Sequence, residues 1–197
     1  MKGSANRYSK ETIDKIGNAI VYLAHHIPDL SKTKLLKLLY LIEESSAVKY
    51  HTPFFGIRFE VWQAGPVAKD VFMDLSEKAV LLKDFVETVQ AKNGGTYIKP
   101  VSEFNDDEFS DHDVDVLDSI VRSYGKKTAE ELVKLTHKES SLWYKAAKEN
   151  NLLDSFRSGK VNYSSIEIDF TNLLPSCAAE VYLENRELNQ SMEAFKE

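Results

Sequence analysis

Hydrophobic residues are densest between positions 34 and 42, where they recur with the spacing of a helix. One helical face carries apolar residues at positions i, i+3, i+4 and i+7, namely Leu35, Leu38, Leu39 and Ile42. A second apolar face is formed by Leu36, Tyr40 and Leu41. The segment is too short to span a bilayer, which takes about 20 apolar residues. We therefore predict a helix buried at the centre of the core, capped by Ser31 and running to about position 49.

Helical periodicity recurs on both sides of this central segment. Ser9 is placed to cap a first helix that Pro28 ends, and Ser110 is placed to cap a later helix. Thr128 and Glu131 have the spacing of a capping box, in which two side chains satisfy backbone N–H groups at a helix start. Further helices are expected from position 140 or 141 and over positions 175–195.

Two regions favour β-structure. Residues 57–62 alternate between apolar and polar side chains, as a half-buried strand does. Residues 85–89 and 96–101 flank the sequence Asn93-Gly94-Gly95, which is a strong hairpin signal. We expect these segments to form a small antiparallel sheet.

Between the two β regions, Pro66 suits the first position of a third helix, because that position needs no N–H partner. After Gly159 the chain is expected to be irregular or strand-like up to about position 170. The predicted fold class is α+β and mainly α, with a helical bundle around a buried central helix and a small antiparallel β-sheet or hairpin.

Composition and charge narrow the picture further. Hydrophobic residues make up 43% of the 197 residues, which is enough for a substantial core. The single cysteine, Cys177, rules out an internal disulfide, and no apolar export signal follows the N-terminus, so we expect a cytoplasmic protein. The net charge of −6 is concentrated in the second half, where eight acids occur between Glu103 and Asp118. Such a block can attract a basic partner.

No motif indicates catalysis or metal binding. The sequence around Asp111 and Asp113 lacks the glycine and the final glutamate of a calcium loop, so it is better explained as an acidic helix start. Cys177 is expected to be a small apolar filler, because nothing places a base beside it. His137 near Glu139 could act as a base, but its place at a helix end favours a structural role. We expect no metal, no cofactor and no enzymatic activity.

Two features leave alternatives open. Lys32, Lys34 and Lys37 could contact phosphates, but without interleaved aromatic residues they are better interpreted as solvated ends of a buried helix. Trp62 lies on the same face of the predicted strand as the polar residues Arg58 and Glu60. It could be a partner-binding anchor or a cover for the core.

Three motifs occur in a fixed order along the chain. The first is Lys34-Leu35-Leu36-Lys37-Leu38-Leu39-Tyr40, and the second is Trp62-Gln63-Ala64-Gly65-Pro66-Val67. The third is Thr136-His137-Lys138-Glu139 followed by Trp143. Together they resemble the Panacea domain, a family also described as SocA-like or phage-associated GepA-like antitoxins. The resemblance covers roughly residues 12–150. The family typically has a proline before the tryptophan, where this chain has Leu142.

The resemblance implies an antitoxin that neutralises a cognate toxin, encoded by an adjacent bacterial or prophage gene, through direct protein–protein binding. On this basis residues 1–8 are a flexible tail and residues 9–158 a Panacea-like domain. Residues 159–197 are a C-terminal extension whose terminal helix packs on the domain. Two alternatives remain, a proteolytic adaptor that delivers the toxin to an AAA+ protease and a phage-associated nucleic-acid-binding regulator. Neither a nucleic acid nor a membrane is an expected partner.

The residue patterns and the family resemblance together give three groups of candidate residues. The expected partner contacts are Trp62, Gly65, Pro66 and Val67. The expected charge-steering patch is Asp106, Asp107, Glu108, Asp111 and Asp113. The expected structural core residues are Leu35, Leu38, Leu39, Tyr40, Ile42 and Trp143.

Overall fold

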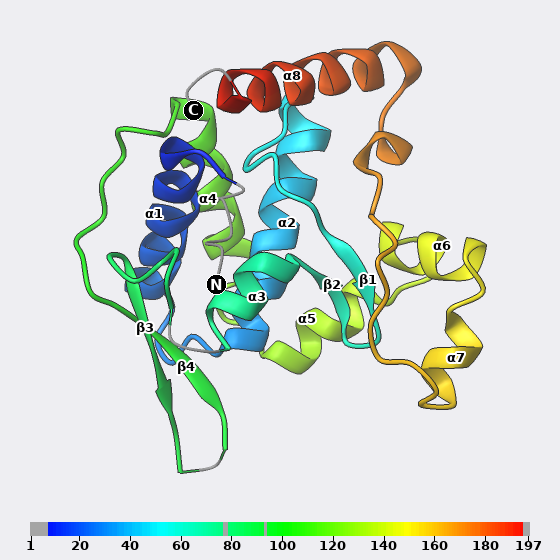
Figure 1. Ribbon diagram of the computed structural model, residues 1–197, viewed down its shortest axis with the longest axis horizontal. Helices are drawn as coiled ribbons and strands as arrows, with labels where there is room; N and C mark the ends of the chain where they lie inside the picture. Colours follow the sequence, from blue (N-terminus) through cyan, green and yellow to red (C-terminus); the bar gives the residue numbers. More distant parts are fainter. Residues whose placement is uncertain (1–7, 77–78, 93, 195–197) are drawn as a thin grey trace, which may run out of the picture.

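The central helix predicted from the sequence is α2 (Lys32–Tyr50), and the other elements are arranged around it (Figure 1). The computed structural model describes residues 8–76, 79–92 and 94–194. The remaining elements are, in chain order, α1 (Lys10–His26), β1 (Glu60–Trp62), β2 (Gly65–Val67), α3 (Lys69–Asp74), β3 (Val86–Gln90), β4 (Thr96–Pro100), α4 (Asp111–Tyr124), α5 (Ala129–Thr136), α6 (Leu142–Glu149), α7 (Leu153–Arg157), the 3-10 helix η1 (Phe170–Leu173) and α8 (Ser176–Ala194). The predicted fold class, α+β and mainly α, is confirmed.

The helix starts follow the capping residues that the sequence indicates. The side chains of Ser9, Ser31, Ser110, Thr128 and Ser141 each accept a hydrogen bond from a backbone N–H in the first helical turn. Capping boxes form at the starts of both α4 and α5, so the predicted box at α5 is confirmed.

Helix α2 is buried along most of its length and contacts α4, α5, β2 and η1. All six residues expected in the core are buried: Leu35, Leu38, Leu39, Tyr40, Ile42 and Trp143. The expectation that the lysines of this helix are solvated is wrong for Lys34 and Lys37, which are both buried. Lys37 reaches a backbone carbonyl of β2, and Lys34 reaches the carbonyl of Gly125 at the end of α4. A backbone carbonyl oxygen therefore accepts a hydrogen bond from each of these amino groups, and the one at Lys37 is buried.

The β-structure differs from the prediction in one respect. The hairpin of β3 and β4 forms as expected, but it does not share a sheet with residues 57–62. Instead, β1 pairs with β2 in a second antiparallel hairpin, with Trp62 opposite Gly65. Pro66 therefore lies in a strand and not at a helix start, and α3 begins only at Lys69. Proline is tolerated there because β2 is an edge strand, which does not need the missing N–H.

The segment after Gly159 runs beside the free edge of β1. The N–H groups of Val61 and Gln63 donate to the carbonyls of Ile166 and Asn162, and the Ile168 N–H donates to Phe59. Helix α8 then crosses one end of α2 (Figure 1). Its Tyr182 is buried and donates a hydrogen bond to Glu43 of α2. The proposed division between residues 158 and 159 stays a prediction.

Two further observations concern residues discussed above. Cys177 is exposed at the start of α8, so the expectation that it fills the core is wrong. Within the described residues, no helix is both long enough and apolar enough to cross a membrane. Residues 1–7 of the predicted tail and Asn93 of the predicted hairpin turn lie outside the described part.

Candidate functional site

The turn between β1 and β2 brings the three sequence motifs together. Gln63 and Ala64 form this turn and are exposed, while Trp62 is half-buried beside it. The next three residues, Gly65, Pro66 and Val67, are buried against α2. The accessible surface of this motif therefore consists of Gln63, Ala64 and part of Trp62.

Side chains from distant parts of the chain hold the backbone carbonyls of this turn. Trp143 Nε1 donates to the carbonyl of Trp62 at 2.9 Å. His137 Nε2 lies 3.0 Å from the carbonyl oxygen of Gln63, and the His137 ring packs on Trp143 with 3.9 Å between ring centroids. Lys37 Nζ donates to the carbonyl of Pro66 at 2.9 Å. The turn is thus fixed from α2, from the end of α5 and from α6.

Gln63 is also held by its own polar groups. Its backbone N–H donates to the carbonyl of Asn162 at 2.9 Å, and its Nε2 donates to the carbonyl of Phe156 at 2.6 Å. Because these contacts come from α7 and from the segment after it, the chain beyond the third motif also shapes the turn.

Lys37 is the most deeply buried cation of the site, with 1% of its surface exposed. Burial lowers the pKa of its amine from 10.5 to about 7. The space around it explains the glycine at position 65. A Cβ at Gly65 would lie 3.0 Å from Lys37 Cε and 3.0 Å from Thr136 Oγ1, and the φ angle of +101° is itself unfavourable for other residues. Gly65 therefore lets the strand approach the amine closely.

A pocket of about 290 Å³ opens beside the turn. It is lined by aromatic and cationic side chains, including Trp62, Phe72, Tyr163, Lys32 and Lys37. The Trp62 ring meets the edge of Phe72 at 5.0 Å between centroids, and Lys32 Nζ lies 4.4 Å from the centroid of Phe72. Of the two interpretations of Trp62, the structure supports parts of both, because the ring packs on neighbours and also lines an accessible pocket.

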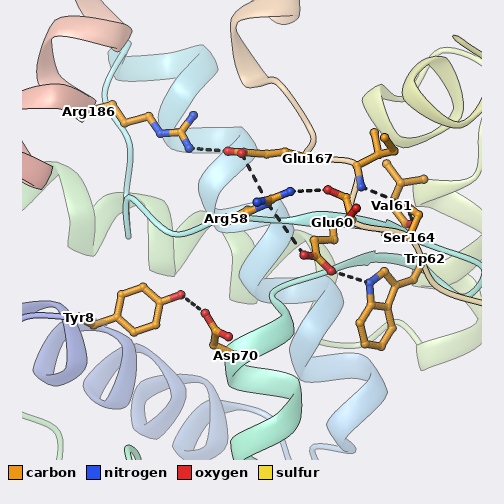
Figure 2. A network of polar contacts seen from close by, with 11 residues as sticks. Tyr8, Arg58, Glu60, Val61, Trp62, Asp70, Ser164, Glu167 and Arg186 are labelled. Carbon is orange, nitrogen blue, oxygen red and sulfur yellow. Dashed lines mark hydrogen bonds and ion pairs between the residues drawn. The ribbon is translucent and has the colours of Figure 1, made fainter. Parts of the chain in front are cut away.

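A chain of charged groups connects Trp62 with α8 (Figure 2). Trp62 Nε1 donates to Glu60 Oε2 at 3.0 Å, and Glu60 lies 3.9 Å from Arg58 Nε. Arg58 Nε lies 3.5 Å from Glu167, which also pairs with Arg186 of α8. Glu60 is 7% exposed, so the end of this series of polar contacts that lies beside Trp62 is shielded from water. The C-terminal segment is therefore linked by ion pairs to the carboxylate that accepts the Trp62 hydrogen bond.

The acidic residues lie elsewhere. In Figure 1 the segment between β4 and α4 runs along the opposite side of the molecule from the β1–β2 turn. Asp106, Asp107 and Asp111 are exposed there, and Glu108 is half-buried. Asp113 serves the capping box of α4 and lies 3.1 Å from Lys15 Nζ. The structure therefore does not bring the expected steering patch and the expected contact residues together.

The ring of His137 is held on both sides by the backbone. Each ring nitrogen of His137 lies within hydrogen-bond distance of a backbone carbonyl, that of Val133 at 2.6 Å or that of Gln63 at 3.0 Å. Within the described part of the chain, no group of three His, Cys, Asp or Glu side chains is arranged to hold a metal ion.

The sequence did not indicate the contributions of Lys37, Gln63, Asn162 or Tyr163 to this site. The motif Lys-Leu-Leu-Lys carried one usable signal, because Tyr40 and Leu41 lie at i+3 and i+4 from Lys37 and place it beside an apolar surface of the helix. No local signal could have placed residues 162 and 163 beside the turn.

Comparison with known families locates the motifs in one unit. A family model described as "Antitoxin SocA-like, Panacea domain" matches residues 35–144. This range contains Lys37, the β1–β2 turn, His137 and Trp143, and it ends before residues 162 and 163. Searches among curated proteins and among solved structures return no match.

Proposed function

The chain belongs to the family of SocA-like antitoxins with a Panacea domain, and we propose that it neutralises its cognate toxin by direct binding at the β1–β2 turn. One observation carries the proposal. Residues from three separate motifs of the family-matched range, Lys37, His137 and Trp143, all bond to backbone carbonyls of the β1–β2 hairpin, two of them at or beside the exposed turn and one in buried β2. Lys37 and Trp143 are buried, so neither is itself presented as a surface contact.

Rigidity is the physical reason for assigning the contact to this turn. A loop that is already ordered loses little conformational entropy on binding, so more of the contact energy appears as affinity. Gln63 and Ala64 are exposed. The adjacent pocket is lined by Trp62 and Phe72, whose aromatic rings can contact an apolar side chain of the toxin. In this proposal the buried residues Gly65, Pro66 and Val67 act by holding the turn in position.

The acidic segment has a different role in this proposal. Asp106, Asp107, Glu108 and Asp111, with the partly paired Asp113, attract a basic toxin over a distance. Such charges raise the association rate more than they strengthen the final complex. Neutralising Asp106 and Asp107 together is therefore expected to slow association while the dissociation rate stays unchanged.

Co-expression with the product of the adjacent gene tests the proposal. Growth should be rescued, and the two proteins should purify as a stable complex. Ala64→Arg should abolish both, because a long cation would occupy the exposed turn. Val80→Arg is the matched control, since Val80 is 70% exposed and lies outside the turn and its pocket.

Other outcomes would contradict binding at this turn. Equal rescue by Ala64→Arg and Val80→Arg would place the contact elsewhere. Rescue accompanied by disappearance of the toxin would instead support the adaptor that delivers it to an AAA+ protease. An adjacent gene product that is harmless on its own would remove the antitoxin assignment for this pair.

A further inference from the structure

A second and larger pocket is lined by α2 further along from the residues that line the first pocket. It has a volume of about 550 Å³ and is lined by residues of α2, α4, η1 and the end of α5. Thr136 takes part in both places, since it lines this pocket and its Oγ1 would lie 3.0 Å from a Cβ at Gly65. The pocket is therefore continuous with the elements that hold the β1–β2 turn.

Glu44 is the acidic group of this pocket. Its carboxylate accepts a hydrogen bond of 2.7 Å from the hydroxyl of Tyr40. Burial raises the pKa of Glu44, and the Tyr40 hydrogen bond offsets this only in part. Among the described residues, no Lys, Arg or His nitrogen lies within 4.0 Å of its carboxylate. Glu44 is thus a partly desolvated acid without a cationic partner.

The two lysines that line the pocket do not change this conclusion. Lys49 is paired with Asp115 and also lies over the ring of Tyr50. Lys138 is exposed and makes no ion pair with any described residue. Both ammonium groups are therefore directed to other partners or to water.

The rest of the lining is suited to a hydrogen-bond donor. Ser45, Ser119 and Ser123 line the pocket, and their hydroxyls make no hydrogen bond to the described residues. A guanidinium carries five N–H donors and an ammonium three, so either cation needs acceptors beyond a single carboxylate. Leu41, Ile120 and Leu135 supply apolar surface for the methylene stem of such a side chain.

We propose that this pocket receives an arginine or lysine side chain of the toxin, with Glu44 as its ion-pair partner and the serine hydroxyls as further acceptors. The proposal rests on the proposed function, because the occupant belongs to the toxin that the β1–β2 turn binds. It adds a specific anchor to that contact. It also states the chemistry of the partner, which must present a protruding basic side chain.

Affinity measurements with the purified toxin test this anchor. Glu44→Gln keeps an acceptor for the Tyr40 hydroxyl but removes the charge, and it should weaken binding by roughly 10–100-fold, mainly through faster dissociation. Glu149→Gln is the matched control, since it changes the net charge equally at an exposed position outside the pocket. Ser123→Phe, which fills the pocket from its exposed edge, should weaken binding without altering Glu44.

A double-mutant cycle identifies the occupant. The arginine or lysine of the toxin whose replacement by glutamine has no further effect in the Glu44→Gln background is the one that enters the pocket. If the wild-type protein binds the toxin and Glu44→Gln matches Glu149→Gln, the anchor is refuted while the proposed function stands. If the wild-type protein does not bind the toxin, the proposed function fails and the anchor fails with it.

Discussion

Replacing Lys37 with methionine tests the effect of a buried amine on the central helix. Burial lowers the pKa of Lys37 from 10.5 to about 7. Between these values the unfolded chain holds a proton that the folded chain has released, so stability rises with pH. The slope is at most about 1.4 kcal/mol per pH unit. Over the whole window the gain is at most about 5 kcal/mol, and below about pH 7 Lys37 contributes no further change.

Glu43, two turns along the same helix, acts in the opposite direction. Burial raises its pKa from 4.5 to about 7, although the N–H groups of Phe54 and Phe55 and the Tyr182 hydroxyl donate to its carboxylate. Between pH 4.5 and 7 the folded chain binds more protons, so stability falls as pH rises, by at most about 3 kcal/mol. The two windows meet near pH 7, where we expect a minimum of stability.

Urea denaturation followed by circular dichroism between pH 5 and 9.5 measures this profile. Lys37→Met should remove the rise above pH 7, and Glu43→Gln should reduce the fall below it. At pH 7 the methionine variant should be more stable than the wild type by a few kcal/mol, after a loss of about 1–3 kcal/mol because the buried Pro66 carbonyl no longer has a donor. Parallel curves for Lys37→Met and the wild type above pH 7 would refute the reasoning.

Three further substitutions test the packing. Leu39→Ala should lower the free energy of unfolding by about 2–5 kcal/mol, because this leucine is fully buried, and thermal or urea unfolding measures the loss. Gly65→Ala should destabilise far more than Gly94→Ala in the same assay, since both have positive φ but only Gly65 is crowded; equal losses would contradict the close approach of Lys37. Trp143→Phe keeps an aromatic ring but loses the indole N–H that donates to the Trp62 carbonyl, so the toxin should bind more weakly under conditions in which the variant is still folded; unchanged affinity would remove Trp143 from the support of the turn.

The parts of the fold that local chemistry determines could be predicted from the sequence. Ser9, Ser31, Ser110 and Thr128 begin helices because each side chain competes for N–H groups within three residues of itself. The β3–β4 hairpin forms because a glycine-rich turn separates two strands of high β-propensity. These signals act over a few residues, so they do not depend on the tertiary structure.

The elements that depend on distant partners could not be predicted in the same way. Pro66 after Gly65 has the local signature of a helix start, yet its carbonyl is taken by Lys37, 29 positions earlier in the chain. The same contact buries Lys37, although a lysine at a helix start is ordinarily solvated. Asn162 and Tyr163 join the site only because the C-terminal segment runs beside β1, and no motif marks that pairing.

The ionisable groups of α2 can be separated by where their partners lie. Lys37 is bonded to a backbone carbonyl of β2 and Glu43 to backbone N–H groups of the segment after α2, so their burial lowers stability but fixes the positions of these segments. Glu44 has a tyrosine hydroxyl but no cation or backbone partner among the described residues. Its desolvation is therefore offset only in part, by the Tyr40 hydroxyl. Glu44→Gln should consequently stabilise the isolated protein slightly while weakening the complex, a combination that a purely structural glutamate would not produce.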